Sequence, residues 1–190
     1  MSARRLVVGI SGASGVILGV RLLELLRELA IETHLVMSRA AILTIGHELG
    51  RPIEQVKALA SVVHPPSDVG ASIASGSFKT EGMIVAPCSM RTLAAIATGV
   101  TDTLLTRAAD VVLKERRRLV LLPRETPLHL GHLRNMVAVT EMGAVVMPPV
   151  PAFYTGASSL EAIVDQILGR ALDLFGLDHP GVVRWQGGRP

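Results

Sequence analysis

Short apolar runs alternate along the chain with longer stretches in which apolar residues recur every three or four positions. A short continuous run indicates a strand buried on both faces, and the longer recurrence indicates an amphipathic helix. The predicted strands cover residues 4–10, 33–38, 82–89, 118–125 and 144–150. The predicted helices cover residues 15–30, 39–50, 53–60, 90–99, 102–117, 129–143 and 158–175.

Apolar strands that alternate with crossover helices predict a parallel sheet covered on both faces. A chain of 190 residues suits one such domain. We therefore predict a single α/β domain over residues 1–190, doubly wound in three layers as in a Rossmann or flavodoxin-like fold. The Gly-, Ser- and Pro-rich residues 65–80 predict a loop. Residues from about 178–190 predict a tail that packs across a neighbour or frays.

All strands of such a sheet point the same way, so ligands bind in a crevice beyond their carboxyl ends. A polar or proline-containing segment follows each of the five predicted strands: "SGASG", Ser38, "PCSMRT", "PRE" and "PPVPAFY". The sequence therefore predicts that these segments, although distant in the chain, lie at one edge of the sheet.

The composition is apolar for a soluble protein, with 49% hydrophobic and 18% charged residues and a mean hydropathy of +0.45. No run of about 18 uninterrupted apolar residues exists, so we predict no membrane span. We attribute the apolar composition to burial between subunits instead. The apolar part of "MSARRLVVGI" is too short for a signal peptide, which predicts a cytoplasmic protein.

The charge, the aromatic content and the cysteine and histidine residues argue against a nucleic-acid-binding protein, a disulfide-bonded protein and a metalloprotein. A net charge of +3 and a pI of about 9.6 fit a compact anionic ligand, whereas 3% aromatics and no long basic run argue against nucleic-acid binding. Cys88 is the only cysteine, which excludes an internal disulfide and a cysteine-based zinc site. His129 and His132 are three apart on a predicted helix, but no third ligand accompanies them, and we predict no metal.

The segment "GISGASG" combines glycines for a tight turn with two serine hydroxyls at the start of a helix. Backbone N–H groups in such a turn bind phosphate or another anion. The dinucleotide pattern G-x-G-x-x-G, the Walker A motif and the nucleophile elbow G-x-S-x-G are all absent. We therefore predict that this loop binds the phosphate of a mononucleotide.

Two further segments carry candidate chemistry. Cys88 and Ser89 lie between a predicted strand and a helix, where we favour Ser89 as the helix cap and backbone amides as the ligand contacts over a nucleophilic thiol. Arg124 ends a predicted strand beside Glu125, so its guanidinium is placed to grip a phosphate while the carboxyl is a candidate proton carrier. Lys114 recurs at helical spacing with Arg107 on the preceding helix.

Six motifs together resemble the UbiX-type flavin prenyltransferases, which belong to the flavin-dependent decarboxylase-like flavoproteins. The motifs are "GISGASG", "ASGSF", "PCSMRTL", "LLTRAADVVLKERR", "LVLLPRETPLH" and "PPVPAFY", and the resemblance runs from about residue 4 to Trp185. It implies a metal-independent transferase that joins a dimethylallyl group from dimethylallyl monophosphate to N5 and C6 of FMN. The product, prenylated FMN, is the cofactor of partner UbiD-type decarboxylases in ubiquinone synthesis.

The resemblance also implies roles for individual residues. Ser14, Glu48 and Glu125 correspond to catalytic residues, with Ser14 at the reacting end of the flavin and the two carboxylates handling protons. Lys114, Tyr154 and Arg170 correspond to the prenyl-phosphate site. The FMN site corresponds to Gly12, Ala13, Ser14, Ser38, Cys88, Ser89, Met90, Arg91 and Arg124. Family members form homododecamers with sites at subunit interfaces, and we expect all these residues to meet at a single rim.

Two alternatives stay open. Flavin-dependent cysteine decarboxylases share the flavin loop, but they use a catalytic His and carry a P-x-M-N-x-x-M-W segment after the fifth strand, where this chain has "PPVPAFY" without an Asn. Hydroxyarylic acid decarboxylase subunits are the same prenyltransferase under another name. An FMN-binding electron carrier would bind the flavin without chemistry, but such carriers tend to be acidic, whereas this chain is basic.

Overall fold

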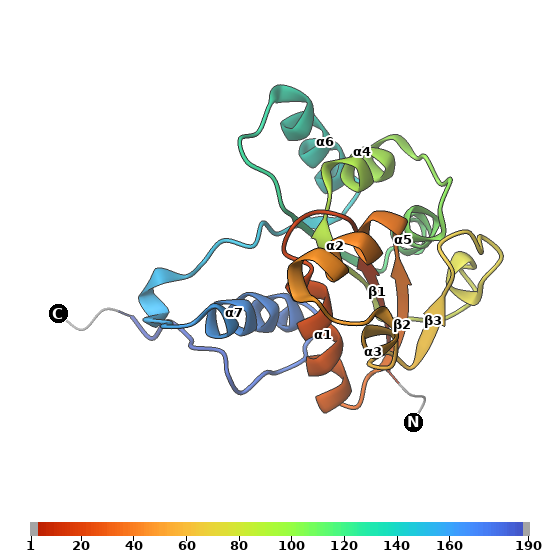
Figure 1. The fold of residues 1–190 in the computed structure, drawn as a ribbon. Coiled ribbons are helices and arrows are strands. Elements are labelled where there is room, and N and C mark those ends of the chain that lie inside the picture. The colour runs from red at the N-terminus through yellow and green to blue at the C-terminus, as the bar shows by residue number, and fades with distance from the viewer. Residues whose placement is uncertain (1–3, 188–190) are drawn as a thin grey trace. The chain divides into compact units, whose positions relative to one another are not determined.

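The sheet of the protein is entirely parallel and has six strands, in a computed structural model that describes residues 4–187 (Figure 1). The strands lie in the order β3-β2-β1-β4-β5-β6, the doubly wound order. Their bounds are β1 Arg5–Ile10, β2 Glu32–Met37, β3 Val62–His64, β4 Gly82–Cys88, β5 Arg118–Pro123 and β6 Val145–Val146.

Seven α-helices accompany the sheet within the described residues. They are α1 Ile17–Glu28, α2 Arg39–Leu49, α3 Ile53–Lys57, α4 Met90–Thr98, α5 Leu104–Lys114, α6 Leu130–Glu141 and α7 Leu160–Asp173. Two short 3-10 turns are η1 Ser72–Ala74 and η2 Phe153–Thr155. None of these helices is long and apolar enough to cross a membrane.

Alternate residues of the strands face opposite layers, as the strand period of two requires. Val7 and Met83 pack against Leu105 of α5 in one core cluster, which also contains residues of α4 and α6. Leu6 and Ile84 occupy the intervening positions and are fully buried as well. Strands buried on both faces explain why the sequence shows continuous apolar runs rather than alternation.

The predicted α/β class and parallel sheet are confirmed, with two differences in the strands. β3 was not predicted, because it has only three residues, two of them exposed, and leads directly into Pro65 and Pro66. The predicted strand 144–150 is reduced to the two residues of β6, since prolines follow at positions 148, 149 and 151 and cannot donate to a neighbouring strand.

The chain divides into two compact units, one ending at Pro148 and one beginning at Pro149. The first unit contains the whole sheet with α1 to α6, and the second contains η2, α7 and the segment that follows α7. Within the second unit, residues 182–184 contact α7 rather than fraying. Residues 188–190 of the predicted tail lie outside the described residues.

Candidate functional site

The buried side chain of Ser11 joins the turn after β1 to the end of β4. Its Oγ donates to the carbonyl oxygen of Pro87 at 2.8 Å and accepts from the backbone N–H of Ser89 at 2.7 Å. Just beyond β5, the backbone N–H of Arg124 donates to the carbonyl oxygen of Cys88 at 3.2 Å. The carboxyl ends of β1, β4 and β5 are therefore held side by side, as the polar segments after the strands predicted.

A cavity of about 580 Å³ opens at this edge, within the size range of small-ligand sites. Residues that follow β1, β2 and β4 line the cavity. It therefore lies at the switch point of the doubly wound sheet, where ligands bind in such folds. Four residues of the predicted FMN site line it: Gly12, Ser38, Ser89 and Arg91.

Three helices begin at the cavity. The side chains of Ser38, Ser89 and Thr103 cap α2, α4 and α5, and each accepts a hydrogen bond from a backbone N–H of the first helical turn. The N-terminal end of a helix carries partial positive charge and attracts anions. Arg39 and Arg91 also line the cavity, and because Asp102 on the same wall pairs with Arg91, the three helix ends and Arg39 are the groups that favour an anionic ligand.

The turn before α1 is capped by a carboxylate of the protein itself. Glu48 of α2 accepts from the backbone N–H of Gly15 at 2.9 Å and from that of Val16 at 3.1 Å. Gly15 has a φ of +93°, a conformation that favours glycine. Glu48 therefore occupies the N–H groups of Gly15 and Val16, while Gly12 of the same loop lines the cavity, and the binding of a phosphate by the "GISGASG" loop stays a prediction.

Burial raises the pKa of Glu48, but hydrogen bonds from Ser14, Gly15 and Val16 and the positive charge of Arg124 outweigh it, so the pKa lies below its usual value. Glu48 is therefore ionised at neutral pH. The same contacts show that Ser14, Glu48 and Arg124, which come from three distant segments, lie close together.

Cys88 ends β4 and is fully buried, with its Sγ directed at the carbonyl oxygen of Ser89. Burial raises the pKa of this thiol to about 12, so it is protonated at neutral pH. Such a thiol is not a nucleophile, in agreement with the reading of Cys88 as a strand-end residue. Met90 begins α4 and is half-buried against the core, while Ala13 is half-buried in the turn after β1.

Glu125 follows Arg124 directly and is exposed in the single chain, where its Oε1 accepts from the backbone N–H of Thr126 at 3.0 Å. The side chain of Arg124 is exposed as well. Both side chains are therefore accessible to a ligand or a second subunit beyond the end of β5.

Lys114 lies away from the cavity. It is the last residue of α5, about 15 Å along the helix from Leu104 at roughly 1.5 Å per residue. Its Nζ is 2.6 Å from Glu115 Oε1, and α5 leads into the amino end of β5. Because α5 runs back across the sheet and its two ends lie at opposite edges, Lys114 does not reach this rim within one chain, and its place at a site shared between subunits stays a prediction.

Tyr154 and Arg170 belong to the second unit. The Tyr154 ring lies edge-on to the ring of Trp185, with 5.4 Å between ring centroids. The Nη1 atom of Arg170, near the end of α7, donates to Oδ2 of Asp173 at 2.6 Å.

His129 caps α6, since its Nδ1 accepts from the backbone N–H groups of Gly131 and His132. This capping role accounts for the "HLGHL" motif without a metal. Among residues 4–187, no group of three or more His, Cys, Asp or Glu side chains is placed to hold a metal ion.

Sequence reasoning missed five polar residues of the cavity wall: Arg39, Ser67, Thr92, Asp102 and Thr103. Arg39 directly follows Ser38 at a strand end, so its position in the chain was a usable signal. Thr103 opens a T-x-x-T capping box before α5, which is also readable. Asp102 pairs with Arg91 at 3.2 Å, and the spacing of these two residues in the sequence does not indicate this contact.

The Flavoprotein family model matches residues 1–172. A protein named Flavin prenyltransferase UbiX from Neisseria meningitidis serogroup B is 59% identical over 184 residues, which cover 97% of this chain and 97% of that protein. The solved structure of AnUbiX in complex with FMN and dimethylallyl pyrophosphate has a TM-score of 0.97 at 55% identity, covering 98% of this chain and 100% of that one. A dodecameric FMN-dependent Ubix-like decarboxylase from Escherichia coli O157:H7 has a TM-score of 0.94 at 54% identity, covering 96% and 100%.

Proposed function

The chain belongs to the UbiX-type flavin prenyltransferases of the Flavoprotein family, and on that premise we propose its reaction. It transfers a dimethylallyl group from dimethylallyl monophosphate to N5 and C6 of reduced FMN. The resulting prenylated FMN serves a UbiD-type decarboxylase in ubiquinone biosynthesis. We place the enzyme in the cytoplasm, where both phosphorylated substrates are made.

One observation of the structure carries the proposal. The N-termini of α2, α4 and α5 and the side chains of Arg39 and Arg91 all meet at one cavity at the sheet's switch point. The cavity volume of about 580 Å³ suits a flavin mononucleotide, and the convergent positive ends suit its phosphate. We therefore assign the FMN phosphate to the side of Ser38, Ser89 and Arg91, and the isoalloxazine to the side of Ser14.

The reaction requires groups that move protons. The donor's carbon–oxygen bond breaks and phosphate leaves with the bonding electrons, while N5 and C6 of the flavin form bonds to the five-carbon unit. Two protons leave N5 and C6; one is taken up by the donor's alkene carbon and the other by phosphate or solvent. We assign proton handling to two carboxylates, Glu48 beside Ser14 and Glu125 beside Arg124.

The departing phosphate needs positive charge, because a close unit-charge pair is worth roughly 4 kcal/mol at an effective dielectric of 20. We assign this role to Arg124, Lys114 and Arg170, with Tyr154 beside the donor. Lys114 lies at the opposite edge of its own sheet, so we propose that it serves the site of a neighbouring subunit.

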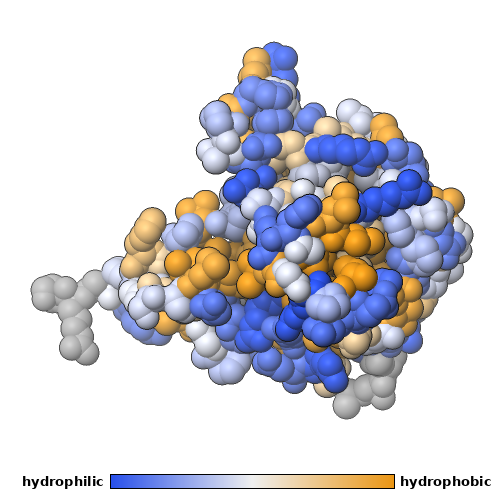
Figure 2. Space-filling model, in the orientation of Figure 1, coloured by the Kyte–Doolittle hydropathy of each residue, from blue (hydrophilic) through white to orange (hydrophobic). Residues whose placement is uncertain are grey.

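A shared site implies an oligomer, and we propose a homododecamer. Leu130, Leu133 and Val137 form an apolar stripe on α6 whose members are 45–59% exposed. Apolar patches also lie at the surface in the space-filling view, coloured orange (Figure 2). Contiguous exposed apolar surface of this kind is typical of subunit contacts.

Release of inorganic phosphate tests the proposal. Purified protein is incubated without oxygen with dimethylallyl monophosphate, and separately with the pyrophosphate, in the presence or absence of reduced FMN. We expect release of phosphate from the monophosphate only when reduced FMN is present. Release of pyrophosphate from the pyrophosphate donor alone, detected as phosphate after pyrophosphatase is added, would reassign the donor, and release of neither leaving group would leave an electron carrier or a decarboxylase as the function.

A further inference from the structure

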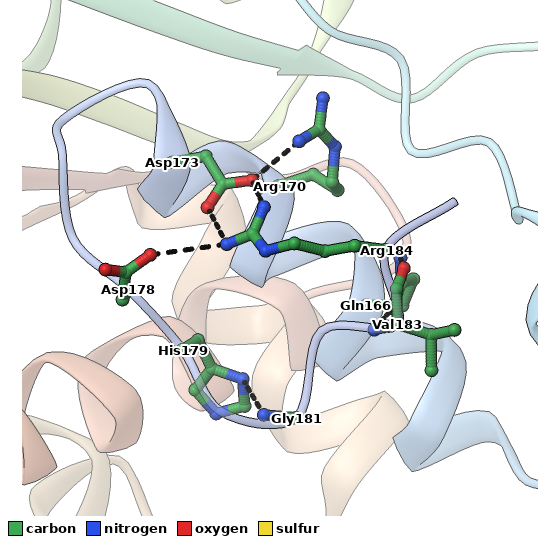
Figure 3. Close-up of polar contacts among 8 residues, drawn as sticks. All are labelled: Gln166, Arg170, Asp173, Asp178, His179, Gly181, Val183 and Arg184. Atoms are coloured by element: carbon green, nitrogen blue, oxygen red, sulfur yellow. Dashed lines mark hydrogen bonds and ion pairs between the residues drawn. The ribbon is translucent and has the colours of Figure 1, made fainter. Parts of the chain in front are cut away.

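The segment after α7 is fixed to that helix by a buried amide. The Oε1 atom of Gln166 accepts from the backbone N–H of Val183 at 2.9 Å, and its Nε2 donates to the Val183 carbonyl oxygen at 3.0 Å (Figure 3). Gln166 is buried, so these two bonds satisfy both polar ends of its side chain. We call residues 182–185 the C-terminal strap.

Two more contacts extend the docking of the strap along α7. A Cβ atom at Gly169 would overlap the side chain of Val182, so the strap lies directly against the helix at this glycine. The guanidinium of Arg184 donates through Nη1 and Nη2 to the two carboxylate oxygens of Asp173, at 2.9 Å each. Positions 166, 169 and 173 share one face of a helix, so the strap is anchored along two turns.

Asp173 faces a second guanidinium, that of Arg170, as Figure 3 shows. The side chain of Asp173 is only 16% exposed, against 55% for Arg170 and 45% for Arg184. Hydrogen bonding from Arg184 is the largest influence on the pKa of Asp173, which lies below its usual value despite the opposing effect of burial. Arg184 also approaches Asp178 at 3.3 Å, but Asp178 is almost fully exposed and its charge is screened by water.

Arg170 has guanidinium N–H groups that its bond to Asp173 does not use. Its bond to Asp173 uses Nη1, and no other partner of Arg170 is found among the residues that the structure describes. A carboxylate paired with Arg170 alone would cancel the charge of that guanidinium and compete with any anion. Arg184 binds both oxygens of the carboxylate in a bidentate arrangement and so offsets the charge that Asp173 would otherwise direct at Arg170 alone.

We propose that Arg184 is a positioning residue for donor binding: it neutralises Asp173, so that Arg170 keeps its charge for the phosphate of the dimethylallyl donor. This inference rests on the proposed function, which assigns Arg170 to that phosphate. The strap also contacts Tyr154 through the ring of Trp185. Within this unit the strap therefore contacts Tyr154 directly and Arg170 through Asp173.

The test measures phosphate release at saturating reduced FMN for the wild type, two variants of the strap contact and one control variant. We expect Arg184→Gln to raise the KM for the donor about tenfold and to leave the Kd of FMN unchanged. The double variant Asp173→Asn with Arg184→Gln lacks the competing carboxylate, and its KM is expected to return to within about threefold of the wild type. Arg51→Gln removes an ion pair of similar exposure with Glu24 in the other unit and serves as the matched control with an unchanged KM.

The double variant separates the electrostatic role from a structural one. If the strap only stabilises the fold, removal of both charged groups leaves the KM at least as high as in Arg184→Gln, and the inference is overturned. An unchanged KM in Arg184→Gln overturns it as well. Should Arg184→Gln fail to fold, Arg184→Lys, which keeps the charge but not the fork, is expected to give a smaller rise in KM.

A calorimetric titration with inorganic phosphate keeps the inference separate from the proposed function. If the wild type releases no phosphate from the donor, the proposed function fails and this titration decides the inference. Weaker binding of phosphate by Arg184→Gln, with recovery in the double variant, supports the role of Arg184. Equal binding by all variants contradicts it.

Discussion

The carboxylate of Glu48 lies 2.9 Å from the backbone N–H of Gly15, although 33 residues separate the two in the chain. The contact joins Glu48, the next-to-last residue of α2, to the glycine turn that precedes α1. It also places a negative charge at the positive end of α1, in the position where a bound phosphate was expected.

Glu48→Gln is expected to lower the free energy of unfolding by about 1 kcal/mol near neutral pH, a value limited by the exposure of this side chain. Because the folded-state pKa of Glu48 is lowered, its contribution is present above the ordinary value of 4.5 and is lost as the pH falls through the lowered value. Urea unfolding at about pH 7 and about pH 3 measures the difference. Glu54→Gln, at an exposed ion pair with Lys57, is the control, and an equal effect of Glu48→Gln at both pH values would contradict the account.

Arg91→Gln is expected to raise the Kd of FMN about tenfold, because a guanidinium at the cavity wall binds phosphate through charge-assisted hydrogen bonds. Riboflavin lacks the phosphate, so its Kd is expected to stay the same. Fluorescence titration with both flavins measures the two constants. Equal weakening of FMN and riboflavin would place Arg91 against the ring system instead.

Lys114→Ala and Glu125→Gln are each expected to release phosphate slowly, for different reasons. A mixture of the two variants is expected to recover activity. Lys114 lies at the opposite sheet edge from Glu125, so a shared site takes the two residues from different subunits. When both variants are dissociated, mixed and reassembled, about a quarter of the sites regain both native residues. Recovery of phosphate release in the mixture checks this, and persistent inactivity would show that one chain supplies both.

Cys88 is expected to resist alkylation in the folded protein. Its pKa is raised by burial from 9.0 to about 12, which lowers the thiolate fraction about a thousandfold at a given pH. Iodoacetamide treatment followed by mass spectrometry of the intact protein compares the native and the urea-unfolded chain. Rapid labelling of the native protein would show that the thiol is accessible and reactive.

Most of the sheet could be predicted because its strands are buried on both faces and so appear as uninterrupted apolar runs. Cavity residues directly after strands, such as Ser38 and Ser89, followed from the same reasoning, since parallel strands end at one edge. β3 could not be predicted, because Val62 and Val63 are partly exposed and give no burial pattern. The position of Lys114 at the far end of α5 could not be predicted, because helical spacing reveals which residues share a face and not which end of the sheet they reach.

Contacts between distant segments were also beyond the sequence pattern. The hydrogen bonds of Glu48 to Gly15 depend on how α2 returns over the glycine turn, and no local motif encodes that geometry. The docking of Arg184 on Asp173 likewise requires the chain to reverse after α7. Both contacts involve charged side chains that a pattern-based reading treats as ordinary surface residues.

The mass of the flavin recovered after one anaerobic incubation with reduced FMN and dimethylallyl monophosphate tests the central claim most directly. The account predicts FMN that is heavier by one C5H8 unit, formed by the wild type and strongly reduced in Glu125→Gln. Recovery of unmodified FMN alone, from protein that binds both substrates, would contradict it.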